Sequence, residues 1–202
     1  GQGPASVEQR YDEVISGPFS LMEMEKAEKE GYDGVVMACV GDVAVAAGKE
    51  ALRIPVVGNG QASMTLATLL GRRFSIIAPI GADAPIFEDL VNSYGLESKL
   101  ASVRAVEMPV LDVMKAGVDR LKQVILEACK KAVKDDGADV IVLGCGAFAV
   151  RSMARWLQQQ LGVPVIDPDF ASVKIVEMLV KGGLAQSKKT FPLPAEKLRV
   201  LK

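Results

Sequence analysis

The sequence predicts an α/β protein built from two similar halves that face each other across a cleft. One observation is the alternation of short apolar segments with helical segments, which is typical of parallel sheets covered by helices. A second is an internal repeat, in which the same residue types recur at a constant separation. Its matching pairs are Gly31 and Gly137, Asp33 and Asp139, and Cys39 and Cys145. The repeat indicates a duplicated α/β unit, with one thiol on each side of the cleft.

The repeat continues beyond the cysteines, which supports a duplication. Residues 54–57 (IPVV) match residues 163–166 (VPVI), and Ala62-Ser63 matches Ala171-Ser172. Two thiols on opposite sides of a cleft suit a reaction that removes a proton from one face of a carbon and returns it to the other.

The first half alternates helices and short apolar strands. Parallel strands that are buried on both faces are apolar throughout, and Gly often ends a helix. On these grounds we expect helices at residues 19–30, 42–52 and 61–70, and strands at 34–38 and 54–57. Gly31 and Gly71 follow the first and last of these helices.

The second half continues the same alternation. The expected strands are residues 74–78, 102–106, 139–144 and 163–166. The expected helices are residues 86–94, a long amphipathic helix at 113–134, 148–161 and 171–180. The segment from Gln186 onward is expected to wrap the surface.

The expected boundaries follow from this symmetry. Residues 1–71, completed by the C-terminal segment 169–202, would form one half, and residues 72–168 the other. The second half opens with a strand and a helix that have no counterpart in the first half. We therefore expect the first strand and helix of the N-terminal half to be missing before Gly1.

Composition narrows the classes of function. The chain has 202 residues, half of them hydrophobic, and a net charge of −1, which suits a packed globular core. No apolar run reaches the roughly 18 residues of a membrane span, and no basic patch suggests nucleic acid as a partner. Three cysteines do not form a disulfide framework, so we expect a reducing, cytoplasmic setting.

The chain contains no histidine. This excludes Ser–His and Cys–His catalysis and His-ligated zinc, and three cysteines without a CxxC pair would make a poor structural zinc site. Acid–base chemistry must therefore use Cys, Asp, Glu, Lys or Tyr, and no metal site is expected.

The main candidate site consists of Cys39 and Cys145. Each follows a buried strand and precedes a helix, and ligands of parallel sheets bind at the carboxyl ends of strands. Free N–H groups at a helix start can lower a thiol pKa to roughly 3.5–7.5 and can hold an oxyanion. The candidate N–H donors are Val40, Gly41, Gly146 and Ala147. Cys129, outside the repeat, is interpreted as structural.

Weaker candidates surround this pair. Asp42 is either a helix cap or a residue that orients substrate. Residues 58–63 (GNGQAS) hint at a dinucleotide loop but lack a third Gly, so a tight turn into a helix is favoured. Asn59, Gly60 and Gln61 still qualify as cleft residues, and Gly81 is a further candidate for substrate binding.

At these residues the chain resembles the aspartate/glutamate/hydantoin racemase superfamily, and within it the hydantoin racemase branch. The resemblance covers nearly the whole chain. It is carried by residues 3–13 (GPASVEQRYDE), 37–42 (MACVGD), 54–58 (IPVVG), 63–64 (SM), 70–75 (LGRRFS), 141–146 (IVLGCG) and 162–167 (GVPVID).

The resemblance implies two flavodoxin-like halves related by a pseudo-dyad. It also implies racemisation by two opposed cysteines, matched here by Cys39 and Cys145, without metal, pyridoxal phosphate or another cofactor. A homo-oligomer that acts on a small molecule is expected. Amino-acid racemases of the superfamily carry Asn-Thr after the first Cys and Thr after the second. Here Val40-Gly41 and Gly146-Ala147 follow, which favours a neutral ring over a free carboxylate.

The function expected from the sequence is therefore racemisation of 5-monosubstituted hydantoins. The alternatives are allantoin or amino-acid racemisation, an arylmalonate-decarboxylase-like reaction, and a non-catalytic ligand-binding module.

Overall fold

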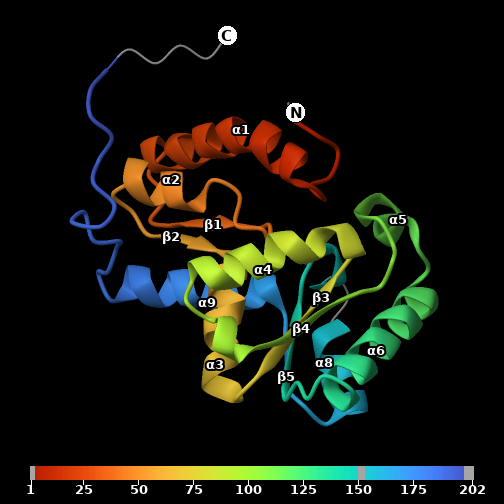
Figure 1. Ribbon diagram of the computed structural model, residues 1–202. Helices are drawn as coiled ribbons and strands as arrows, with labels where there is room; N and C mark the ends of the chain where they lie inside the picture. Colours follow the sequence, from red (N-terminus) through yellow and green to blue (C-terminus); the bar gives the residue numbers. More distant parts are fainter. Residues whose placement is uncertain (1–2, 150–152, 198–202) are drawn as a thin grey trace.

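The computed structural model describes residues 3–149 and 153–197 and shows an α/β fold with parallel strands (Figure 1). The strands are β1 (Val35–Met37), β2 (Val56–Gly58), β3 (Phe74–Ala78), β4 (Leu100–Ala105), β5 (Val140–Leu143) and β6 (Val165–Ile166). The α-helices are α1 (Arg10–Lys29), α2 (Val45–Ala51), α3 (Asn59–Leu70), α4 (Ala84–Ser93), α5 (Val110–Lys115), α6 (Val118–Lys134), α7 (Gly146–Ala149), α8 (Met153–Leu161) and α9 (Pro168–Lys181). Two 3₁₀ turns are η1 (Gly81–Asp83) and η2 (Glu97–Lys99).

The larger sheet has the strand order β4-β3-β5-β6, and all its pairs are parallel. Its central strands β3 and β5 are fully buried, which explains their apolar sequences. Ile76 and Val142 point into a core shared with α3 and α4, whereas Ile77 and Ile141 point into a second core shared with α6 and α8. Alternate side chains of these strands thus pack against helices on opposite faces of the sheet.

The smaller sheet pairs β1 with β2 in parallel. In Figure 1, α1 and α2 lie on one side of this pair and α9 lies on the other. The chain after α9 returns to β2, where the backbone N–H of Val56 donates to Oε1 of Gln186 at 2.9 Å. The amide of Gln186 in turn donates to the carbonyl of Val56 at 3.0 Å. This side chain therefore satisfies an edge of β2 as a neighbouring strand would.

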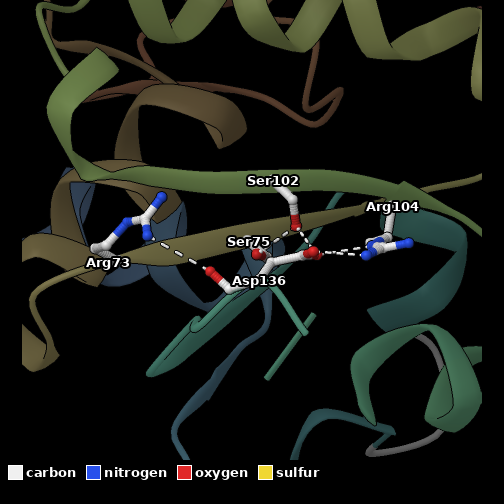
Figure 2. A network of polar contacts seen from close by, with 5 residues as sticks. All are labelled: Arg73, Ser75, Ser102, Arg104 and Asp136. Carbon is white, nitrogen blue, oxygen red and sulfur yellow. Dashed lines mark hydrogen bonds and ion pairs between the residues drawn. The ribbon is translucent and has the colours of Figure 1, made fainter. Parts of the chain in front are cut away.

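A polar network fixes the outer edge of the larger sheet (Figure 2). The Arg104 guanidinium forms a two-point contact with the Asp136 carboxylate, at 2.7 and 2.5 Å. Ser102 donates to the same carboxylate and is bonded to Ser75 on the adjacent strand. Arg73 reaches the backbone carbonyl of Asp136 at 3.5 Å. The network joins β3, β4 and the loop before β5, and it lowers the pKa of Asp136.

The prediction of a single long helix at residues 113–134 is wrong. The structure contains two helices, α5 and α6, because Ala116 and Gly117 have extended backbone conformations with ψ of 144°. Gly117 weakens the helix at this point. The expected helix at 148–161 overlaps α7 and α8, and residues 150–152 lie outside the described residues.

The first helix begins earlier than expected, at Arg10 rather than near Phe19. Gly and Pro disfavour the interior of a helix, but α1 runs through Gly17 and Pro18. No helix within residues 3–149 and 153–197 combines the length and apolarity needed to cross a membrane.

Candidate active site

Cys39 and Cys145 line the same cavity, which has a volume of about 570 Å³. Cys39 lies shortly after the carboxyl end of β1, and Cys145 lies shortly after that of β5. The internal repeat therefore places both thiols at one cavity, each at a strand end as expected for parallel sheets.

The turn that carries Cys39 has an unusual backbone. Asp42 and Ala44 adopt positive φ values of 53° and 58°, so α2 starts only at Val45. The N–H of Asp42 donates to the carbonyl of Cys39 at 3.0 Å, and the N–H of Gly41 hydrogen-bonds to the Cys39 sulfur. This tight turn keeps the thiol at the cavity wall.

Asp42 caps a helix, but not the one that follows it in the sequence. Its buried carboxylate accepts the N–H groups of Gly60 and Gln61, both at 2.7 Å, and the hydroxyl of Tyr94 at 2.6 Å. It thus caps α3, the helix after the next strand. A Cβ at Gly60 would lie 2.3 Å from the Val40 carbonyl, so only glycine lets α3 approach the Cys39 turn this closely.

The Cys145 side is formed by close packing at the end of β5. The N–H of Gly144 donates to the carbonyl of Ile77 on β3 at 2.8 Å. The N–H groups of Ala147 and Phe148 hydrogen-bond to the Cys145 sulfur at the start of α7. The start of α7 therefore contacts the thiol, as the sequence indicated.

Asp169 is fixed beside the Cys145 turn. The Asn59 side chain donates to Asp169 at 2.6 Å and accepts from the hydroxyl of Ser172, also at 2.6 Å. A Cβ built on Gly146 would lie 3.6 Å from the Asp169 carboxylate. The start of α9 therefore contributes an oriented carboxylate to the cavity wall.

Both thiols have raised pKa values in this structure. Burial raises the pKa of Cys39 to about 11, the N–H of Gly41 lowers it, and Asp42, Cys145 and Glu13 raise it. Burial likewise raises the pKa of Cys145, against the N–H of Ala147. The sequence suggested that helix starts would lower these values, but desolvation outweighs the N–H groups. Cys145 acts electrostatically on Cys39, so the two thiols are coupled.

The structure brings some of the predicted substrate-binding residues to the cavity and not others. Those that line it, besides the two cysteines, are Val40, Gly41, Gly146 and Ala147. Those outside the lining are Asp42, Gly60, Gln61 and Gly81. Asp42, Gly60 and Gln61 instead hold the Cys39 turn against α3, and the side chain of Gln61 accepts a hydrogen bond from Lys49.

Four acidic residues of the lining were missed by the sequence analysis: Glu8, Glu13, Asp83 and Asp169. Asp83 follows β3, which is the direct neighbour of β5, so the strand order places it near Cys145. The sequence alone does not reveal this strand order, so it could not predict that Asp83 lies at the cavity. Glu8 accepts the N–H of Val110, which ties the N-terminal segment to α5 across the cavity.

Apolar side chains make up much of the rest of the described wall. Its main apolar residues are Ile86, Phe87, Val110, Val113 and Met114. None of the lining residues in the described part of the chain is Lys or Arg. Residues 3–149 and 153–197 also contain no group of three or more Cys, Asp or Glu placed to hold a metal ion. Such a cavity suits a small, neutral molecule better than an anion, because none of its described lining residues would neutralise a carboxylate.

Comparison with known proteins gives one consistent result. Residues 1–176 match the family described as Asp/Glu/Hydantoin racemase. A hydantoin racemase of Pseudomonas sp. (strain NS671) is 41% identical over 199 residues, which cover 96% of this chain and 78% of that protein. A hydantoin racemase of Rhizobium meliloti is 40% identical, over 95% of this chain and 78% of that protein.

Comparison with solved structures also indicates a racemase. An allantoin racemase structure from Klebsiella pneumoniae has a TM-score of 0.93 and 35% identity, over 99% of this chain and 81% of that one. With a family match over most of its length and two cysteines at one cavity, this chain belongs to the Asp/Glu/hydantoin racemase family and is a racemase.

Proposed function

We propose that the protein racemises neutral 5-monosubstituted hydantoins by proton transfer between Cys39 and Cys145. The observation that carries the proposal is a single cavity lined by both thiols and by carboxylates, with no cationic side chain among the lining residues within 3–149 and 153–197. That lining disfavours a free amino acid, whose α-carboxylate would meet only like charge. The similarity to hydantoin racemases supports the same substrate class.

In the proposed reaction, one cysteine acts as a thiolate and takes the proton from C5 of the ring. The electron pair of the C–H bond moves onto the adjacent carbonyl, which gives an enolate. The other cysteine, a neutral thiol, then returns a proton to C5 from the opposite face. One thiol and one thiolate are present before and after turnover with their roles exchanged, so the reverse reaction uses the same pair.

The raised pKa values suit a carbon acid. A thiolate that is difficult to form is a strong base, and the C5 proton requires one. The N–H groups of Gly41 and Ala147 bond to the sulfur atoms and so help each thiolate in turn. The N–H groups of Val40 and Gly146, in the same two turns, are our candidates for the enolate oxygen.

Allantoin is the second candidate substrate, and the structural likeness to allantoin racemases favours it. It carries the same hydantoin ring with a ureido group at C5, so the chemistry is unchanged. The two candidates differ only in what the substituent contacts. Apolar substituents would pack against Val110, Val113 and Met114, whereas a ureido group would donate to the carboxylates of the wall.

Single-enantiomer hydantoins and allantoin, followed by polarimetry with each cysteine variant, test the proposal. Cys39→Ala and Cys145→Ala should each lose racemisation, while exchange of the C5 proton with deuterated solvent survives for one enantiomer in each variant. Cys129→Ala is the matched control, because Cys129 is fully buried in the core next to α8 and lies outside the cavity lining.

Full racemisation by either active-site variant would refute the two-base assignment. Release of carbon dioxide from arylmalonates, without racemisation of any hydantoin, would point instead to a decarboxylase. Inertness of both thiols to a small alkylating agent would favour a binding module.

Two further features belong to the same proposal. The first is the division into halves of residues 1–71 with 169–202 and residues 72–168, which the separate sheets support. The second is a cytoplasmic homo-oligomer. Exposed apolar side chains on α9, among them Phe170, Val173 and Met178, offer a surface for self-association.

A further inference from the structure

Asp83 lines the cavity and has a carboxylate oxygen without a hydrogen-bond partner in the described part of the chain. The residue is 5% exposed and lines the same cavity as the two cysteines. Its Oδ2 accepts only a long hydrogen bond from the N–H of Ile80, at 3.4 Å. Its Oδ1 is buried and has no hydrogen-bond partner within residues 3–149 and 153–197. Buried polar atoms are nearly always paired, so this oxygen requires a physical explanation.

The surroundings limit what could pair with Oδ1. Glu8, Glu13 and Glu107 all act on Asp83 as like charges, and the wall residues that the structure describes include no Lys or Arg. A hydrogen-bond donor that enters the cavity from outside would supply the missing partner. A free carboxylate cannot donate, whereas the amide N–H of a ring can.

Asp83 also lies on the Cys145 side of the site. It follows β3, the neighbour of β5, and its carboxylate acts electrostatically on the Cys145 thiol. A ring held by Asp83 would thus sit beside one of the two sulfur atoms. The hydantoin ring carries two amide N–H groups, and one of them adjoins the reacting carbon.

We infer that Asp83 is a substrate-binding residue whose carboxylate accepts a hydrogen bond from a ring N–H of the hydantoin. The inference rests on the proposed function and assigns it a recognition element. It explains why the protein keeps a carboxylate that its own chain leaves unpaired: the substrate completes the pairing. The same contact would make the enzyme prefer cyclic amides that carry a free N–H group.

A cycle between protein and substrate variants tests the contact. The parent is the C5-substituted hydantoin that the wild-type enzyme converts best, and its N1-methyl and N3-methyl derivatives each remove one donor. Methylation at the bonded nitrogen should lower kcat/KM about 10- to 100-fold in the wild type, since it leaves a buried charged acceptor unpaired. The other methylated compound serves as the matched steric control.

In Asp83→Ala, the parent should lose about 10- to 100-fold in kcat/KM, mainly through KM, and methylation at the same nitrogen should then cost less than about threefold. Asp83→Asn keeps a carbonyl acceptor of similar shape and should retain part of the discrimination. Glu107→Gln removes a nearby charge outside the cavity lining and should leave the discrimination unchanged.

Equal methylation penalties in the wild type and in Asp83→Ala would overturn the inference, as would full activity of the wild type on both methylated compounds. Circular dichroism and thermal melting confirm that each variant is folded. Failure of the proposed function has a different signature, because the wild type would then not racemise the unmethylated parent.

Discussion

Replacing Asp83 by Asn should stabilise the substrate-free protein at neutral pH. Burial and the neighbouring carboxylates raise the pKa of Asp83 from 3.8 to about 6. The folded state therefore binds the Asp83 proton more tightly than the unfolded state. The stability linked to this proton is complete below pH 3.8 and is lost as pH rises through 6. At pH 7 the wild type thus carries the cost of an ionised, unpaired carboxylate.

The magnitude follows from the shift in pKa. Each pKa unit corresponds to about 1.4 kcal/mol, so a shift of about two units sets an upper limit of about 3 kcal/mol. The carboxyl borders a cavity open to solvent, which reduces the penalty. We expect Asp83→Asn to gain about 1–2 kcal/mol, or about 2–8 °C in Tm for a chain of this size.

Thermal melts of the wild type and Asp83→Asn at pH 4.5 and 7.5 check this expectation. The gain should be large at pH 7.5 and small at pH 4.5, where Asp83 is protonated in the folded protein. Glu107→Gln is the control, because Glu107 lies beside the same turn but is exposed. A variant less stable than the wild type at pH 7.5, or a gain that does not change with pH, would refute the reasoning.

Two further changes address the framework of the site. Gly60→Ala should destabilise the protein by about 2–3 kcal/mol and reduce activity, because the new Cβ would lie 2.3 Å from the carbonyl of Val40. Gly117→Ala, with nothing within 4 Å, is its control in urea unfolding, and equal stability of the two variants would contradict the clash. Burial raises the pKa of Cys129 from 9.0 to about 12, so its contribution to stability is lost as pH rises above 9. Unfolding free energies at pH 8 and 10.5 should therefore fall less steeply in Cys129→Ala, by about 1–2 kcal/mol over that interval, and identical slopes would count against this pKa.

Much of the fold was predictable because it depends on local patterns. The apolar run at Phe74–Ala78 predicts β3 with its observed bounds, and most other strands are found within a few residues of their expected positions. The family, expected from the two Cys motifs, is confirmed by the match over residues 1–176. Local patterns were insufficient where a helix is interrupted, as at Gly117, since hydrophobic periodicity continues through the break.

The sequence by itself determined the alternating α/β pattern, the repeat that pairs Cys39 with Cys145, and the lack of histidine among these 202 residues. Only the tertiary structure decided what surrounds the thiols. In the folded protein Asp42 accepts N–H groups at the start of α3, and Asp83 lines the cavity with an unpaired oxygen. The physical reason is that periodicity and turn chemistry act over a few residues, whereas burial and pairing depend on strand order and packing between distant segments. The acidity of the two thiols illustrates this, because N–H groups at neighbouring residues favour the thiolate and burial by the whole fold outweighs them.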